Sequence, residues 1–503
     1  MGLPFDAATV LAVLAMLILA WEASRNERKP VLALIGLSLI GVAILTRLLG
    51  HGGFVARLTG LAADVSVAFL LASATMALRR ARALPFLVLG LLAACLTVVL
   101  MAGTRFSQRA AMAFADPPSS ASLLVELGPD DHLSEIEPVL EHFHVDAERA
   151  FPTMGMSADA DLAQTYLLSG DAVGLQEASE RLAGDRENVD VVEWNRTVSL
   201  SPVEAENPAR SARVPIVAND PLASSQWALG AAHVNEALRL LRRLRPQKKA
   251  IVAILDTGVD AEHEDLSAVF GNSPARTDLV GHGTHCAGIA GAVANNGVGI
   301  ASLNWEGRFI EILSFQALPN GGSGTYESIA QAIIDATKAG ADVLSLSLGS
   351  DSPAPPRVVA EAIEYAQRQG AIVVAAAGNA SHDAVHHMPS NIDGVIAVAA
   401  VDAGLNKATF SNTNTSLARP LAAPGVGILS LKPGDEYTSM NGTSMATPLV
   451  AGLVGVLRSL DPELSATEAY EILSGTGTTG PDAGLTGPVV NAAAAIQRVT
   501  GGV

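Results

Sequence analysis

KKAIVAILDTGVD, residues 248–260, is the stretch from which the fold of this chain can be worked out. Its first part is an almost continuous apolar run that ends at Asp256, and a glycine-containing turn follows. A short apolar run that ends in a turn is typical of a strand buried on both faces of a parallel sheet. An acidic residue at the carboxyl end of such a strand is either a turn residue or a functional group.

The same pattern recurs along the chain from about residue 220. Four further strand-like runs occur, and stretches with helical spacing lie between them, for example 326–340 and 356–370. The further runs are 309–318, 341–349, 371–379 and 394–402. Strands that alternate with helices predict an α/β fold with a parallel sheet and helices on both faces. Ligands of such sheets bind beyond the carboxyl ends of the strands.

Two other short segments carry residues that could act together with Asp256. His282 lies in GHGTHCAG (281–288), before a predicted helix, and Ser444 lies in NGTSMATP (441–448), at the start of another. A serine hydroxyl is a weak nucleophile until a neighbouring base takes its proton, and a carboxylate orients that base. Taken singly, each residue could be an ordinary turn or polar contact, and the spacing alone does not connect the three.

The three segments, in the order Asp, His, Ser, resemble those of the subtilase (subtilisin-like) serine protease family. The resemblance covers about residues 220–500 and implies a subtilisin-like parallel sheet with helices on both faces. It also implies a peptide-bond hydrolase that works through an acyl-enzyme intermediate. In that mechanism Ser444 is the nucleophile, His282 is the general base and then acid, and Asp256 orients the imidazole.

Further site residues follow from the same resemblance. AAAGN, which ends at Asn379, resembles the family's oxyanion segment, so Asn379 and the backbone N–H of Ser444 are the expected donors to the developing charge. Two segments resemble the rails that pair with a substrate backbone, and Tyr326 and Leu348 would line an apolar pocket. The rail residues are Ser323, Gly324 and Tyr326 on one side and Ser347, Leu348 and Gly349 on the other.

The pocket nearest the scissile bond cannot be assigned a preference from the resemblance. Its expected wall, SHDAVHHMPSN (381–391), departs from the family pattern. Asp383 in this wall would favour a basic substrate side chain if it faced the pocket, and otherwise it is a solvated loop acid.

The chemistry requires no cofactor, but the resemblance implies a structural calcium ion. Asp265 in EHEDL and Asn296 in ANNGVGI (294–300) would be its side-chain ligands, since calcium prefers oxygen donors. The alternative for these residues is a turn Asp and a tight Asn-Gly loop.

The first 110 residues differ from the rest in charge and hydropathy. They carry ten Lys or Arg and four acidic residues, a net charge of +6, which leaves −24 for the remainder of a chain whose net charge is −18. Acidic chains do not suit nucleic acid, which needs a basic face. Four stretches in this part are apolar and near the length that crosses a bilayer. They are 5–21, 31–49, 61–78 and 84–103.

We therefore expect residues 1–109 to form a multi-pass membrane domain of about four helices in the cell membrane. Arginine and lysine are more frequent after the first and third stretches than in the other loops. Because short basic loops stay in the cytoplasm, this asymmetry places both termini, and with them the catalytic domain, on the extracytoplasmic side.

A small predicted domain, 122–195, lies between a linker at 110–121 and a connector at 196–219 that precedes the catalytic domain at 220–503. Its predicted elements follow the ferredoxin-like order β-α-β-β-α-β. The strands are 122–127, one that ends near 150–153, 161–170 and 189–194, and the helices are 132–143 and 172–184. The resemblance implies that this domain is a propeptide that inhibits the enzyme and is cut off within the connector.

These expectations together describe a membrane-anchored serine endopeptidase that acts on proteins or peptides and processes itself. The alternative is a catalytically silent protein with a subtilase fold that only binds peptides. A replaced triad residue would indicate the silent protein, and none of Asp256, His282 and Ser444 is replaced.

Overall fold

The computed structural model describes residues 122–200, 216–319 and 321–502. All of them belong to one compact unit of the chain. The four predicted membrane spans, the linker at 110–121 and most of the connector at 196–219 lie outside the described residues.

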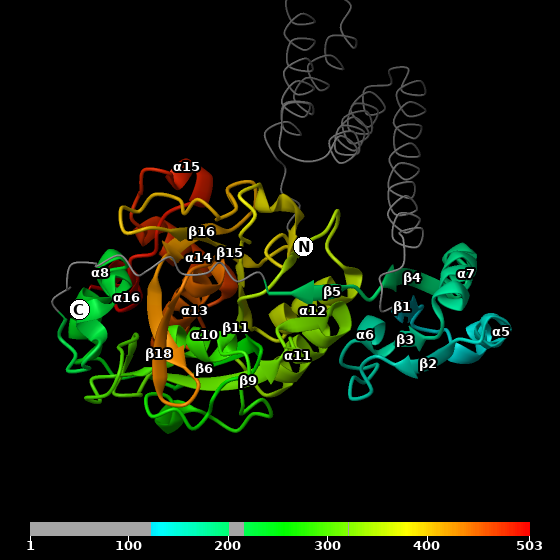
Figure 1. The fold of residues 1–503 in the computed structure, drawn as a ribbon, viewed down its shortest axis with the longest axis horizontal. Helices are drawn as coiled ribbons and strands as arrows, with labels where there is room; N and C mark the ends of the chain where they lie inside the picture. The colour runs from blue at the N-terminus through cyan, green and yellow to red at the C-terminus, as the bar shows by residue number, and fades with distance from the viewer. Residues whose placement is uncertain (1–121, 201–215, 320, 503) are drawn as a thin grey trace, which may run out of the picture. The chain divides into compact units, whose positions relative to one another are not determined.

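Six parallel strands form the central sheet of the α/β part (Figure 1), in the order β16-β15-β13-β11-β6-β9. The strands are β6 (Ala250–Asp256), β9 (Ile310–Gln316), β11 (Val343–Leu346), β13 (Ile372–Ala376), β15 (Ile396–Val401) and β16 (Pro420–Pro424). The first five confirm the sequence prediction. The prediction does not include β16, because proline stands at both of its ends. Proline is tolerated there because β16 is an edge strand.

Helices pack on both faces of this sheet, as the alternation predicts. Val252 and Ile254 of β6 belong to one buried hydrophobic cluster, which includes residues of a first pair of helices. Ala253 and Leu255 belong to another buried cluster, which includes residues of a second pair of helices. Because side chains alternate along a strand, consecutive residues of β6 face opposite helix layers. The first pair is α10 (His282–Gly291) and α13 (Thr443–Leu460), and the second is α11 (Tyr326–Lys338) and α12 (Arg357–Arg368).

The central helix α13 packs closely on α10. Among the described residues it is the single helix that is long and apolar enough to cross a membrane, and 89% of that stretch is buried inside the protein. A Cβ added at Gly452 of α13 would lie 2.4 Å from the carbonyl oxygen of Ala290 in α10. The packing therefore fixes α13, which carries Ser444 in its first turn, against α10, which begins at His282.

The α+β part has the predicted order of strands and helices, with one short helix added before the third strand. Its antiparallel sheet has the order β2-β3-β1-β4, and its two long helices share the sheet's buried cluster. The elements are β1 (Ser122–Leu127), α5 (Leu133–Phe143), β2 (Asp146–Arg149), α6 (Ala160–Ala163), β3 (Thr165–Ser169), α7 (Ala172–Gly184) and β4 (Val189–Trp194).

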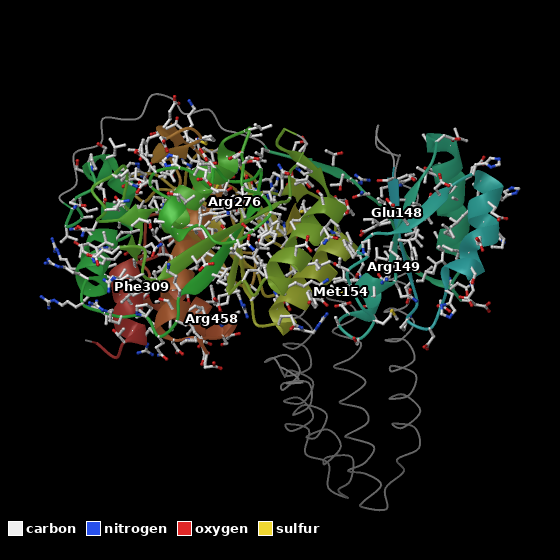
Figure 2. All side chains as sticks on the ribbon, turned by 90° about the horizontal axis from the view of Figure 1, so that it is seen from below. Glu148, Arg149, Met154, Arg276, Phe309 and Arg458 are labelled. Atoms are coloured by element: carbon white, nitrogen blue, oxygen red, sulfur yellow. The ribbon has the colours of Figure 1, made fainter. Side chains whose placement is uncertain are left out.

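Two boundaries of the α+β part were predicted wrongly. The second strand ends at Arg149, before the predicted end near 150–153, and residues 161–163 belong to a helix instead of a strand. The edge strand β2 is largely exposed and mostly charged, so no apolar alternation marks it. Arg149 donates to the carbonyl oxygens of Met154 and Ala163 at 2.9 and 2.7 Å, which holds the following loop against α6 (Figure 2).

Replacing Gly452 with alanine tests the close packing of α13 on α10. We expect Gly452→Ala to lower the free energy of unfolding by about 1–3 kcal/mol, because the new methyl group meets a backbone oxygen. Urea unfolding of a Ser444→Ala background, which cannot digest itself, measures the change. Gly475→Ala in α14 (Ala466–Thr476) is the control, since an added Cβ there meets nothing within 4 Å. Equal stability of the two variants would contradict the prediction.

Candidate active site

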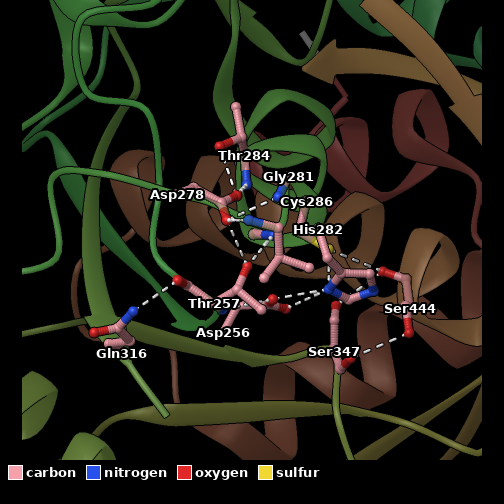
Figure 3. A network of polar contacts seen from close by, with 12 residues as sticks. Asp256, Thr257, Asp278, Gly281, His282, Thr284, Cys286, Gln316, Ser347 and Ser444 are labelled. Carbon is pink, nitrogen blue, oxygen red and sulfur yellow. Dashed lines mark hydrogen bonds and ion pairs between the residues drawn. The ribbon is translucent and has the colours of Figure 1, made fainter. Parts of the chain in front are cut away.

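Asp256 and His282 form a buried acid–base pair (Figure 3). Asp256 ends β6 and is fully buried, while His282 begins α10 and is 7% exposed. The Nδ1 atom of His282 lies 2.8 Å from Oδ1 and 2.9 Å from Oδ2 of Asp256. Burial acts to lower the pKa of His282, but the Asp256 carboxylate outweighs it and raises that pKa well above its ordinary value. The carboxylate also favours the tautomer with a proton on Nδ1, which leaves Nε2 as the basic nitrogen.

A network around Asp278, which the sequence analysis missed, holds this pair in place. The carboxylate of Asp278 accepts from the N–H groups of Gly281 and Thr284 at 2.8 and 2.9 Å and from the hydroxyl of Thr257 at 2.9 Å. Thr257 Oγ1 in turn accepts from the N–H of Gly283 at 3.0 Å. The network therefore supplies acceptors to N–H groups that the first turn of α10 leaves free. An acidic residue a few positions before a predicted helix was the available signal.

Ser444 lies in the first turn of α13, beside the imidazole of His282 in Figure 3. Its Oγ donates to the carbonyl oxygen of Ser347 at 3.1 Å, and no hydrogen bond joins Oγ to His282 in the described structure. The carbonyl oxygen of Ser444 accepts from Ser347 Oγ at 2.8 Å and from Cys286 Sγ at 3.5 Å. The backbone of Ser444 is thus held, while its hydroxyl must turn to reach Nε2. Loose contacts of this kind are common in nucleophile–base pairs without substrate.

Asn379 follows β13 and presents its amide beside Ser444. Its Oδ1 accepts from the backbone N–H and from the hydroxyl of Thr443, both at 2.9 Å. These two bonds fix the amide, and its Nδ2 has no hydrogen-bond partner within the ranges that the structure describes. An amide donor next to a helix N-terminus suits an oxygen atom that gains negative charge.

An extended segment of this chain already lies along one predicted rail. β5 (Thr197–Ser199) pairs antiparallel with β10 (Ser323–Thr325), and the N–H of Leu200 donates to the carbonyl of Gly322 at 2.9 Å. Gly324 is required in the rail, because an added Cβ would lie 2.2 Å from a backbone oxygen. The rail edge therefore pairs with extended chain through main-chain hydrogen bonds. Its role in holding a substrate stays a prediction.

The opposite rail borders a cavity of about 250 Å³ that Ser444 and Asn379 also line. Leu200 belongs to the same lining, so the segment bound along the rail reaches the candidate nucleophile. Asp351 and His387 line the cavity as well, although the sequence analysis does not assign them to the site. The rail residues in the lining are Ser347, Leu348 and Gly349.

The residues predicted to line the apolar pocket belong to a cluster of buried hydrophobic side chains. Val198 of β5, which pairs with Gly324, is 1% exposed and belongs to the same buried cluster as Tyr326 and Leu348. An apolar side chain of the segment in the groove is therefore removed from water on this side of the site.

The two predicted calcium ligands lie next to each other. Asn296 Nδ2 donates to Asp265 Oδ1 at 2.8 Å, and the N–H of Ile300 donates to the other carboxylate oxygen at 2.8 Å. Asp265 is fully buried, and burial raises its pKa to about 7. No lysine, arginine or histidine side chain of the described residues forms an ion pair with it. The buried carboxylate has no cationic partner and is an oxygen donor of the kind that calcium prefers. Asn296 Oδ1 accepts from the N–H of Val298 at 2.8 Å, so the amide would have to turn to offer its oxygen to the same ion.

Comparison with known proteins finds similarity along the α/β part. A family model described as "Subtilase family" matches residues 247–490. Subtilisin DY from Bacillus licheniformis is 39% identical over 255 residues, which is 49% of this chain and 90% of that protein. Thermitase from Thermoactinomyces vulgaris is 42% identical over 241 residues, 46% of this chain and 84% of that protein.

A solved structure extends the similarity beyond the α/β part. The structure of fervidolysin from Fervidobacterium pennivorans, a keratinolytic enzyme related to subtilisin, matches with a TM-score of 0.62 at 25% identity. The match covers 75% of this chain and 61% of that one. This share of the chain is larger than the predicted catalytic domain alone.

Removal of the Asn379 amide tests its place in the site. We expect Asn379→Ala to lower kcat on a chromogenic peptide by about 10²–10³-fold with little change in KM, which is the effect of removing one such donor in subtilisin. Asn406→Ala, on an exposed loop, is the matched control and should leave kcat unchanged. A purely structural role of Asn379 would instead lower thermal stability and leave kcat per folded molecule intact.

Proposed function

This chain belongs to the subtilase family, and on that premise we propose that it is a membrane-anchored serine endopeptidase that processes itself. The observation that carries the proposal is the buried Asp256–His282 pair, whose imidazole lies beside Ser444 (Figure 3). Asn379, whose Oδ1 is fixed by Thr443, keeps its Nδ2 without a hydrogen-bond partner among the described residues. The catalytically silent alternative is less favoured, because each residue of the set is present and hydrogen bonds join Asp256 to His282.

The geometry supports acyl transfer in two steps. His282 Nε2 takes the proton of Ser444 Oγ as that oxygen attacks the peptide carbonyl, and Asp256 stabilises the imidazolium that forms. The carbonyl oxygen gains negative charge between Asn379 Nδ2 and the backbone N–H of Ser444. His282 then gives the proton to the leaving amine, and water releases the acyl group by the reverse sequence.

The proposed propeptide is the ferredoxin-like domain 122–195, which contacts the catalytic part at two helix N-termini. Glu193 accepts from the N–H groups of Arg357 and Val358 at 2.9 and 2.8 Å, at the start of α12. Asn195 Oδ1 accepts from the N–H of Glu327 at 3.0 Å, at the start of α11. Both contacts satisfy N–H groups that a helix leaves free, and a carboxylate also complements the helix dipole.

Self-inhibition follows from where the connector begins. β5 continues from this domain into the groove, and Leu200 lines the cavity beside Ser444. A segment held there excludes other peptides until the connector is cut, and we place the cut within 196–219. Cutting would separate the catalytic domain from residues 1–109, so the docked propeptide would then be its remaining link to the membrane.

Anchoring in the cell membrane, with the catalytic domain outside the cytoplasm, is proposed from the sequence of residues 1–109. The four apolar stretches and the basic loops between them support it.

Calcium at Asp265 and Asn296 is proposed as a structural ion that would neutralise the buried carboxylate. Neither the anchor nor the ion takes part in the chemical steps.

Loss of the nucleophile should stop self-processing. We expect the parent chain to yield a fragment whose N-terminus lies within 196–219, and we expect Ser444→Ala to stay whole, because only Oγ can form the acyl intermediate. Gel analysis and N-terminal sequencing of membranes that contain each form provide the test. Ser474→Ala, in α14, is the control and should be processed like the parent. Intact chains in all three cases would favour the silent peptide-binding alternative.

Docking of the propeptide domain buries carboxyl groups that face one another. The side chains of Glu126 from β1 and Glu361 from α12 are 7% and 4% exposed. Arg357 forms ion pairs with Glu361, with Glu126 at 3.7 Å and with Asp161 at 3.5 Å. Burial and the nearby Glu126 raise the pKa of Glu361 to about 10, and burial raises the pKa of Glu126 and brings that of Glu193 to about 7.

Release of the cut propeptide domain should therefore increase with pH. These carboxyls hold protons at higher pH when docked than when exposed, so the docked state is favoured at pH 5 and loses that advantage as pH rises towards 9. A Ser444→Ala chain cut in the connector by a second protease can be analysed by gel filtration at each pH. Glu361→Gln should keep the two parts together at pH 9, whereas Glu364→Gln, on the exposed side of α12, should behave like the parent. Retention that does not depend on pH would contradict the prediction.

A further inference from the structure

The cavity beside Ser444 receives one particular side chain of a bound peptide. When a peptide carbonyl lies between Ser444 Oγ and Asn379 Nδ2, the space beside Ser444 that can take the side chain of the residue supplying this carbonyl is bordered by Gly349 and Gly378. That space is the cavity of about 250 Å³, which both glycines line. The shape and polarity of its inner end therefore decide which residue is accepted before the scissile bond.

His387 closes the inner end of this cavity. A Cβ added at Gly349 would lie 2.5 Å from Nε2 of His387, and a Cβ added at Gly378 would lie 2.8 Å from its Cε1 and Nδ1 atoms. One imidazole ring therefore lies against Gly349 of one rail and against Gly378, the residue before Asn379, and spans the gap between these two glycines. A long or aromatic side chain that entered the cavity would meet this ring.

The imidazole is held in that position from behind. β14 (His387–Met388) pairs antiparallel with β12 (Ser350–Asp351), which places Asp351 opposite His387. Asp351 Oδ1 lies 3.1 Å from Nδ1 of His387, and its Oδ2 lies 2.8 Å from Nε2 of His382. The His387 side chain is 11% exposed, so packing and the hydrogen bond both restrict its rotation.

The imidazole at the inner end of the cavity is polar and uncharged. The bond to Asp351 places the proton of His387 on Nδ1, which leaves Nε2 as an acceptor at the cavity. Burial lowers the pKa of His387, so the ring is neutral at pH 7. The hydrogen bond to Asp351 raises the pKa of His382, whose positive charge, once protonated, offsets the carboxylate. Asp383, the acid in the wall that the sequence analysis singled out, caps a turn at Val385 and bonds Ser416 instead of lining the cavity.

We propose that His387, held by Asp351, is the specificity-determining residue of this site and restricts the residue before the scissile bond to short, uncharged side chains such as alanine and serine. The proposal rests on the proposed endopeptidase function and defines its substrate class. The ring shortens the cavity for aromatic and long aliphatic side chains, and the Asp351 carboxylate, which also lines the cavity, is already engaged by His387 and His382.

A peptide series that differs only in the residue before the scissile bond tests the proposal. The residues compared are alanine, serine, leucine, phenylalanine and lysine, and kcat/KM is measured for the parent, His387→Gly and His386→Gly. We expect the parent to prefer alanine and serine. In His387→Gly the ratio of phenylalanine to alanine should rise by roughly ten- to a hundredfold, since removing the ring deepens the cavity. His386 is exposed in the same loop, so His386→Gly should keep the parent's ratio.

Each outcome of this series decides a different point. If Ser444→Ala cleaves the peptides as fast as the parent, the proposed function is wrong. If the parent is active and depends on Ser444 but prefers phenylalanine, or if His387→Gly keeps the parent's ratio, the specificity proposal is wrong and the function stands. Should His387→Gly fail to fold by circular dichroism, Asp351→Ala decides. It frees the imidazole to rotate and should raise the same ratio by a smaller factor, and an unchanged ratio would overturn the proposal.

Discussion

The buried contact between Asp256 and His282 is the interaction on which the rest of the structure depends. A carboxylate with no exposed surface is costly unless hydrogen bonds compensate it. Here the imidazole supplies one bond at 2.8 Å and the N–H of Thr257 supplies another at 2.7 Å. Because Asp256 ends β6 and His282 begins α10, the bond forms only when strand and helix are correctly placed. The Asp278 network stabilises the same turn of α10, so the local fold and the acid–base pair support each other.

The free N–H groups at helix N-termini contribute to the fold, to the proposed inhibition and to the proposed catalysis. The first N–H groups of a helix need acceptors from outside it. At α10 the acceptor is Asp278, which lies within the catalytic part. At α11 and α12 the acceptors are Asn195 and Glu193, which belong to the proposed propeptide. At α13 the first turn carries Ser444, next to Asn379, whose Nδ2 has no hydrogen-bond partner among the described residues. The acceptor expected there is the oxygen of a reacting substrate.

The groove is formed by segments that are distant in the sequence, and the chain's own β5 already occupies part of it. One rail holds β5 by main-chain bonds, and Val198 lies in the buried cluster on that side. At the other end, His387 lies against Gly349 and Gly378 and borders the cavity next to Ser444. The same surfaces would therefore bind the inhibitory segment and the substrate. Both would pair with the rail through main-chain hydrogen bonds.

The sequence by itself determined the class of the fold and the triad candidates. Apolar strands that alternate with helical stretches require a sheet covered on both faces, and Asp256, His282 and Ser444 each lie in a long local motif. Periodicity reports only local burial, so it failed for β16, which has proline at its ends, and for the charged edge strand β2. It also could not assign Asp278 or His387. Their roles depend on contacts with residues that only the folded sheet and its loops bring close, and tertiary structure alone decided them.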